Sequence, residues 1–137
     1  MDINVKWKGG LEFESTLPSG HSVTVDAKEE SGGNDNGPRP TELLLNGLAG
    51  CTGVDVAMIL KKMKQDLVDL SIDLKSERAE EHPRRFTDIH LIYKLKGRNL
   101  DEKKVEKAIK LSEEKYCSAS ASLNANITSE YEIEEVE

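Results

Sequence analysis

One stretch constrains the fold more than any other: the apolar run from Leu43 to Leu60, in which Asp55 is the single charged residue. The run lies within residues 38–64, which we expect to form one long helix, because a proline suits its first turn and lysines close its end. A helix that is apolar on nearly every side is normally buried. The run is interrupted and the lysines follow it at once, so it is a poor candidate for a membrane span.

Two further features of this helix point to a contact or a site. Gly47, Gly50 and Gly53 are spaced by three, and each costs a helix about 1 kcal/mol relative to alanine. Close approach of another backbone or of a ligand would compensate for that cost. Cys51 lies among these small residues, which leaves its thiol reachable. Composition alone favours the plainer interpretation that Cys51 is a small apolar side chain in the core, since free cysteines are often buried.

The composition predicts a single domain over residues 1–137 that is covered by a second subunit. Only 4% of the residues are aromatic and 36% are hydrophobic, so an isolated chain would have a thin core. The net charge of −7 argues against binding to nucleic acid or to an anionic membrane. The N-terminus begins in an alternating polar and apolar pattern without a signal peptide, which predicts a cytoplasmic protein.

Alternation of polar and apolar residues predicts most of the remaining elements. We expect strands at residues 2–8, around Leu11 and Phe13, and at residues 21–27, 67–75, 86–96 and 126–134. A second helix begins with Asp101 as its N-cap and buries Val105, Ala108, Ile109 and Ser112, and a short helical segment covers residues 119–123. The order βββ-α-ββ-α-(α)-β predicts the α+β class with mostly antiparallel sheets.

The two long strands have clear apolar faces, and a polar loop precedes the long helix. The expected faces are Val68, Leu70, Ile72 and Leu74 on the first strand, and Ile89, Leu91, Tyr93 and Leu95 on the second. Residues 28–39 contain no apolar residue except Pro38 and are expected to form a polar loop.

The second cysteine follows the buried stripe of the second helix and can therefore approach the first. Cys51 and Cys117 could form a pair in which one thiolate attacks the O–O bond of a peroxide and the other thiol captures the resulting sulfenic acid. The alternative is two unrelated buried thiols.

Other kinds of chemistry have weaker support. His21, His82 and His90 show no short ligand spacing with each other or with the cysteines, so we predict no metal site and no other cofactor. A nucleophile-elbow motif for hydrolysis is also absent.

Several motifs resemble a known family. Residues 40–56, which include Cys51, resemble the central-helix motif of the OsmC/Ohr superfamily. The segments that resemble its YhfA-like branch follow in order: Ser76-Glu-Arg78, His82-Pro83-Arg84, Phe86-Thr87 and Glu114-Lys-Tyr-Cys117-Ser118. The match runs along the whole chain, and both cysteines fall on the family's two cysteine positions.

The resemblance implies an OsmC-like fold and a redox function. The implied assembly is an intertwined homodimer in which two central helices, one per subunit, are wrapped by β-sheets, with active sites at the subunit interface. The implied activity is a thiol-dependent peroxidase that prefers organic hydroperoxides, with Cys51 as the peroxidatic thiol and Cys117 as the resolving thiol.

The family also uses an arginine and a glutamate to hold the reactive cysteine, and here the sequence departs from the pattern. The family's acid position falls on Thr41, and nine residues at about 100° each place Glu42 roughly opposite Cys51. The N-terminal arginine has no match in the first strands, which leaves Arg39 as a candidate substitute. Asp55 lies one turn after Cys51, where an unpaired carboxylate would disfavour a thiolate and a paired one could orient an arginine or His21.

The sequence therefore predicts a cytoplasmic, OsmC-like homodimer that reduces organic hydroperoxides with an unknown dithiol reductant. Two alternatives remain open. One is a thiol sensor or disulfide-handling protein that uses the same cysteine pair. The other is a binding protein whose interface pocket holds a small apolar ligand.

Overall fold

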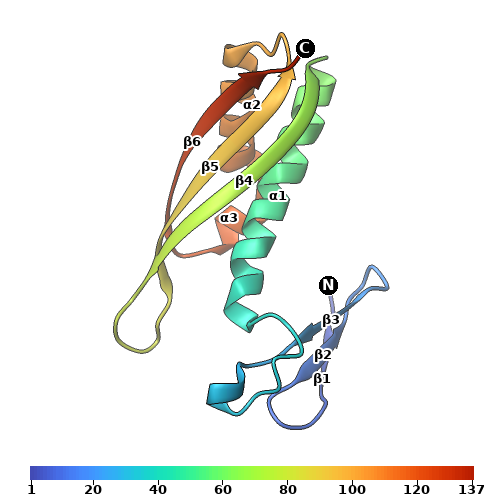
Figure 1. The fold of residues 1–137 in the computed structure, drawn as a ribbon, viewed down its shortest axis with the longest axis vertical. Helices are drawn as coiled ribbons and strands as arrows, with labels where there is room; N and C mark the ends of the chain where they lie inside the picture. Colours follow the sequence, from blue (N-terminus) through green and yellow to red (C-terminus); the bar gives the residue numbers. More distant parts are fainter. The chain divides into compact units, whose positions relative to one another are not determined.

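The computed structural model describes residues 1–137, which form two compact units, Met1–Asn46 and Gly47–Glu137 (Figure 1). Each unit is described by itself below. The expected single domain over residues 1–137 stays a prediction.

The first unit is built on a three-stranded antiparallel meander. Its strands are β1 (Asn4–Trp7), β2 (Phe13–Thr16) and β3 (Ser22–Val25), and they lie in the order β1-β2-β3. The expected strands are therefore present; β1 and β3 are shorter than their alternating patterns, and β2 begins at Phe13, so that Leu11 lies before it. A short 3-10 turn, η1 (Glu29–Ser31), follows before the long helix α1 (Pro40–Lys62) begins.

One buried carboxylate organises the polar loop of residues 28–39. Asp26 is only 2% exposed and accepts backbone N–H hydrogen bonds from Ala27, Asn34 and Asn36 at 2.7, 3.2 and 3.1 Å. Burial by itself would raise the pKa of Asp26, but the three N–H groups and the nearby Arg39 hold that pKa below its ordinary value. The loop is thus tied to the end of β3 by an ionised side chain.

The second unit contains a three-stranded sheet, two helices and a short helical turn. The strands are β4 (Asp66–Arg78), β5 (Phe86–Arg98) and β6 (Asn126–Glu135). Helix α2 (Glu102–Leu111) continues into a π-helical turn, η2 (Ser112–Tyr116), and then into α3 (Ser118–Ser122). The element order predicted from the sequence is confirmed, including Asp101 as the N-cap of α2, whose side chain accepts the N–H of Lys103 at 2.9 Å.

The sheets are mostly antiparallel, as the element order predicts, and the last strand is the exception. Strands β4 and β5 are antiparallel, but β5 and β6 pair in parallel within the order β4-β5-β6. The reason is the crossover through α2 and α3, which returns the chain to the end of the sheet from which β5 starts.

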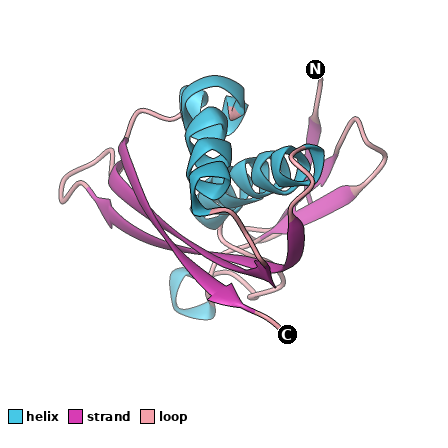
Figure 2. Ribbon diagram, turned by 90° about the horizontal axis from the view of Figure 1, so that it is seen from above, coloured by secondary structure: helices cyan, strands magenta, loops and turns pink.

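The core lies between this sheet and its helices, and Figures 1 and 2 show α1 and α2 on the same face of the sheet. The inward side chains of β5 are all buried, as the alternation predicts: Ile89, Leu91, Tyr93 and Leu95. Helix α1 contributes a row of buried residues at intervals of four: Leu48, Thr52, Val56 and Leu60.

Within one chain, α1 is buried on one face only, so the expectation of burial on nearly every side is not met. Val54 and Met58 are 59% and 53% exposed. A Cβ at Gly53 would lie 3.3 Å from the side chain of Ile72, whereas a Cβ at Gly47 or Gly50 would meet no atom within 4 Å. By length and composition α1 could cross a membrane, with a mean hydropathy of 1.7, but the core helix of a soluble protein meets the same criterion.

A register shift in β4 corrects one predicted core residue. The pairing with β5 is irregular between Leu67 and Asp69, so two successive residues of β4 turn away from the helices. Val68 is consequently 47% exposed, and Leu67 takes its expected place on the inward face with Leu70.

This register can be tested by paired truncations. Leu95→Ala should lower the free energy of unfolding by about 2–5 kcal/mol, because Leu95 is fully buried and its removal leaves a cavity. Val68→Ala should change it by less than about 0.5 kcal/mol, because Val68 is on the exposed side of the bulge. Urea denaturation of the two variants beside the wild type measures both, and equal losses would contradict the register.

Candidate active site at the two cysteines

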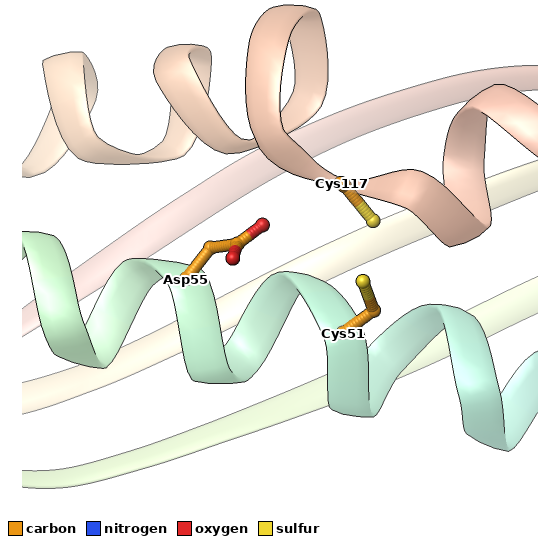
Figure 3. A group of neighbouring side chains, drawn as sticks. All are labelled: Cys51, Asp55 and Cys117. Carbon is orange, nitrogen blue, oxygen red and sulfur yellow. The ribbon is translucent and has the colours of Figure 1, made fainter.

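Two free thiols from different elements face each other in the second unit. Cys51 projects from the middle of α1, and Cys117 follows η2 directly (Figure 3). Asp55, one turn after Cys51, completes a cluster in which the two sulfur atoms and a carboxylate oxygen all lie within 4.8 Å of one another. The structure thus brings together three residues that the sequence analysis selected separately.

The π-helical turn fixes the position of Cys117. The backbone N–H of Cys117 donates to the carbonyl of Ser112 at 2.7 Å, which closes the wide turn at the end of α2. The Cys117 sulfur accepts the N–H of Ser120 at 3.4 Å and so caps α3. The thiol therefore sits at a junction of two helical segments rather than within either one.

The environment of Cys117 favours the protonated thiol. Burial is the main cause and raises the pKa of Cys117 above its ordinary value, and the neighbouring Cys51 raises it further. The hydrogen bond from Ser120 acts in the opposite direction but does not reverse the shift. Cys117 is 4% exposed, whereas Cys51 is half-buried, so the two thiols differ in access.

A chain of buried hydroxyl groups leads away from Asp55. Ser112 donates to the Asp55 carboxylate at 2.9 Å, and the Ser112 hydroxyl lies 2.8 Å from that of Thr52. The Thr52 hydroxyl is also 2.8 Å from the hydroxyl of Tyr93, which donates to Glu113 at 3.0 Å. Burial raises the pKa of Tyr93 well above its ordinary value, so the phenol keeps its proton.

The sequence analysis did not assign a site role to Thr52, Tyr93, Ser112 or Glu113. Three of them occupy buried positions on faces that it recognised as apolar: Thr52 beside Cys51, Tyr93 within β5 and Ser112 at the end of the α2 stripe. A polar side chain on a buried face requires a hydrogen-bond partner, and this requirement was the available signal. This requirement shows that each residue needs a partner, but it does not show that the three residues bond to each other.

An apolar cavity of about 460 Å³ adjoins the cluster on the side of Asp55. It is lined by Asp55, Met58, Ile59, Lys62, Met63, Leu111 and Tyr116. Most of this lining is apolar, and Asp55 and Lys62 are its two charged residues.

The three other supporting residues predicted from the sequence lie in the first unit, where each has local partners. Arg39 binds Asp35 at 2.7 Å and the carbonyl of Gly37 at 3.0 Å. Glu42 accepts the backbone N–H of Arg39 at 2.8 Å and thereby caps the start of α1. The Nδ1 of His21 is 3.0 Å from the hydroxyl of Ser19. A role for any of the three beside Cys51 stays a prediction.

The cluster has the donor types of a small metal site, but we interpret it as a thiol pair. Two thiols and one carboxylate within 4.8 Å would offer a metal ion three donors without any histidine. The two sulfur atoms point toward each other (Figure 3), and one of them belongs to a thiol that burial keeps protonated. The prediction of no metal stays a prediction.

The fold is α+β, and its helical segments bring two free thiols face to face. Residues 32–132 match the sequence model of the OsmC family, described as OsmC-like protein. The chain belongs to this family, the OsmC/Ohr group of redox proteins, as the resemblance implied.

Individual relatives agree with the assignment. Protein YhfA of Escherichia coli K12 is 42% identical over 135 residues, which cover 97% of this chain and 98% of YhfA. A crystal structure of a protein from Aquifex aeolicus VF5 is 36% identical, with a TM-score of 0.79 over 98% of this chain and 97% of that one. The organic hydroperoxide resistance protein OhrB of Bacillus subtilis shares the fold with a TM-score of 0.62 at 18% identity, over 96% of this chain and 98% of OhrB.

The raised pKa of Cys117 leads to a pH prediction. In a Cys51→Ser variant, alkylation of Cys117 by iodoacetamide should be slow at neutral pH and should speed up with increasing pH, because only the thiolate reacts. The pKa of Cys117 is raised because burial disfavours the charged thiolate, so the thiolate forms only at a higher pH. The midpoint of the pH–rate curve should lie above that of a free cysteine measured beside it, and a midpoint at or below that value would contradict the shift.

Proposed function

We propose that this protein is a thiol-dependent peroxidase that reduces organic hydroperoxides as part of an oxidative-stress response. The observation that carries the proposal is the facing pair of free thiols, Cys51 and Cys117, in one cluster with Asp55. The fold that it shares with a protein named for organic hydroperoxide resistance supports the same conclusion.

The difference in access between the thiols sets the order of the steps. Cys51 is the more exposed thiol and attacks the distal oxygen of the hydroperoxide, so the O–O bond breaks, the sulfur becomes a sulfenic acid and an alcohol leaves. Cys117, buried and protonated, then loses its proton and attacks the Cys51 sulfur, which forms the disulfide and releases water. A dithiol reductant then returns both thiols to the reduced state.

The apolar cavity beside Asp55 supports an organic substrate rather than hydrogen peroxide alone. Its volume of about 460 Å³ accommodates an alkyl or aryl group, and its apolar lining would bury that group. The same cavity is the observation that favours an alternative function, a protein that binds a small apolar ligand and uses Cys51 only as part of the wall.

A homodimer is part of the proposal. Helix α1 leaves an apolar strip uncovered in the single chain, with Val54 at 59% exposure beside Gly50 and Gly53. A soluble chain would need a second apolar surface to cover this strip, and the matching strip of a second copy has the required small residues. The OsmC-like fold supports a soluble protein, and the cytoplasmic location stays a prediction.

The peroxidase proposal is tested by mass spectrometry after a stoichiometric pulse of cumene hydroperoxide. The wild type should lose two hydrogen masses as the Cys51–Cys117 disulfide forms. Cys117→Ser should instead accumulate sulfenic or higher acids on Cys51, because its second thiol is missing. Cys51→Ser serves as the matched control and should stay reduced.

The outcomes separate the proposed function from its alternatives. Turnover with excess dithiothreitol identifies an enzyme, whereas a reversible disulfide without turnover identifies a sensor. Thiols that stay reduced for minutes in the presence of peroxide would overturn the peroxidase proposal and favour the ligand-binding alternative.

The homodimer is tested by a charge in the exposed strip of α1. Val54→Asp should convert the dimer to a monomer, because an unpaired carboxylate is costly to bury in an apolar interface. Sedimentation velocity gives the mass, and Glu81→Asp on the exposed β4–β5 connection is the control that should stay dimeric. A wild type that sediments as a monomer at micromolar concentration would contradict the dimer.

A further inference from the structure

The cluster at the thiols has the donor atoms and the size of a site for a thiophilic metal ion. It offers the sulfur atoms of Cys51 and Cys117 and one carboxylate oxygen of Asp55, all within 4.8 Å of one another. Figure 3 shows the three side chains directed into the same space, between α1 and the segment that carries Cys117. A tetrahedral Zn²⁺ ion holds such donors about 3.6–3.8 Å apart, so the cluster would close around it through movements of about 1 Å.

Two of the donors are already held by hydrogen bonds that a metal ion would leave intact. The Ser112 hydroxyl donates to one oxygen of Asp55 at 2.9 Å, which leaves the other oxygen free to bind an ion. The backbone N–H of Ser120 donates to the Cys117 sulfur at 3.4 Å, and a metal-bound thiolate can accept the same bond. Supporting hydrogen bonds of this kind orient metal ligands and raise the affinity of a site.

The cluster also lacks a cationic side chain to balance it. Asp55 forms no ion pair with a lysine, arginine or histidine, although it lies one turn after Cys51 and beside Cys117. A divalent cation would neutralise most of the charge of two thiolates and a carboxylate. Sulfur donors favour zinc over magnesium or calcium, which prefer oxygen ligands.

We infer that the reduced protein binds one Zn²⁺ ion per chain through Cys51, Cys117 and Asp55, and that the bound ion blocks the thiols reversibly. The inference revises the expectation of no metal site that the histidine spacing suggested. The ion is an inhibitor in this account and takes no part in the reaction with peroxide. Three protein donors leave a tetrahedral zinc ion one further position, which a water molecule can fill.

Binding exchanges protons for the metal ion and involves no oxidation. Bonds form from zinc to the two sulfur atoms and one carboxylate oxygen, and any proton on either thiol passes to the solvent. Burial keeps Cys117 protonated, so the ion must displace that proton. The displacement weakens binding and makes it weaker still as the pH falls, which suits an ion that is exchanged rather than kept permanently.

The consequence for catalysis rests on the proposed peroxidase function. A Cys51 sulfur that is bonded to zinc has its nucleophilic lone pair engaged and does not attack the O–O bond of a hydroperoxide. Conversely, a disulfide between Cys51 and Cys117 removes both sulfur donors and releases the ion. Zinc and hydroperoxide therefore compete for the same reduced pair of thiols.

Titration of the reduced, tag-free protein with Co²⁺ tests the site without any peroxide. Cobalt replaces zinc in thiolate sites, and its sulfur-to-cobalt charge-transfer absorption reports each bond to a thiolate. The band should saturate at one ion per chain and disappear when one equivalent of Zn²⁺ is added. Cys51→Ser and Cys117→Ser should each weaken the band and lower the affinity at least about 100-fold, because a thiolate ligand is lost.

Asp55→Asn separates the three-donor site from a simple pair of thiols. It keeps both sulfur atoms, so the charge-transfer band should remain, but the affinity should fall at least about 10-fold because the anionic oxygen is lost. Asp69→Asn is the matched control, since Asp69 is an exposed residue of β4 and should leave the affinity unchanged. Absence of the band in the wild type, or an Asp55→Asn variant that binds as tightly as the wild type, would overturn the inferred site.

The blocking effect is measured on the zinc-loaded wild type. Saturating Zn²⁺ should slow the alkylation of Cys51 by iodoacetamide at least about 10-fold, and EDTA should restore the rate. Unchanged alkylation would overturn the blocking effect, and so would a Cys51–Cys117 disulfide that forms equally fast with and without zinc after a pulse of cumene hydroperoxide. If zinc binds and blocks alkylation while the metal-free thiols ignore the hydroperoxide, the zinc site stands and the peroxidase proposal fails.

Discussion

The arrangement of the second unit depends on the buried hydroxyl of Thr52. It lies 2.8 Å from Tyr93 on β5 and 2.8 Å from Ser112 at the end of α2, so a single atom links the long helix, the central strand and the second helix. Apolar contacts stabilise this core but do not specify a direction. The Thr52 hydroxyl does specify the orientation of α1, because it loses its hydrogen-bond partners if the helix rotates or slides. Cys51 immediately precedes Thr52 on the helix, so the same constraint orients its thiol.

The thiol site combines an asymmetric pair of sulfur atoms with an acidic neighbour. Burial keeps Cys117 protonated, while Cys51 has more access to the outside. Asp55 lies beside the pair and accepts a hydrogen bond from Ser112.

Much of the fold and the central pair of the site could be predicted from the sequence. Alternation gave the strands and the inward face of β5, and the cysteines were identified from their small neighbours and the family motif. The parallel pairing of β6 and the bulge at Val68 depend on contacts between distant segments, which periodicity does not encode. The hydroxyl chain was missed for a related reason: each residue was visible as a polar residue on an apolar face, but its partner lay 41 or 60 positions away.

The π-helical turn at Ser112–Tyr116 makes chain length a determinant of the site. A π turn holds one residue more than the α turn it replaces. The residues that follow are therefore offset by one position from those of a continuous α-helix. Ser112 and Cys117 then both reach the same cluster, although they are five positions apart in the chain. Deleting one residue here would restore an ordinary helix and swing Cys117 away by about 100°. In a relative, a one-residue deletion within this turn would therefore move the second cysteine away from the cluster, whereas a substitution in the turn would leave it in place.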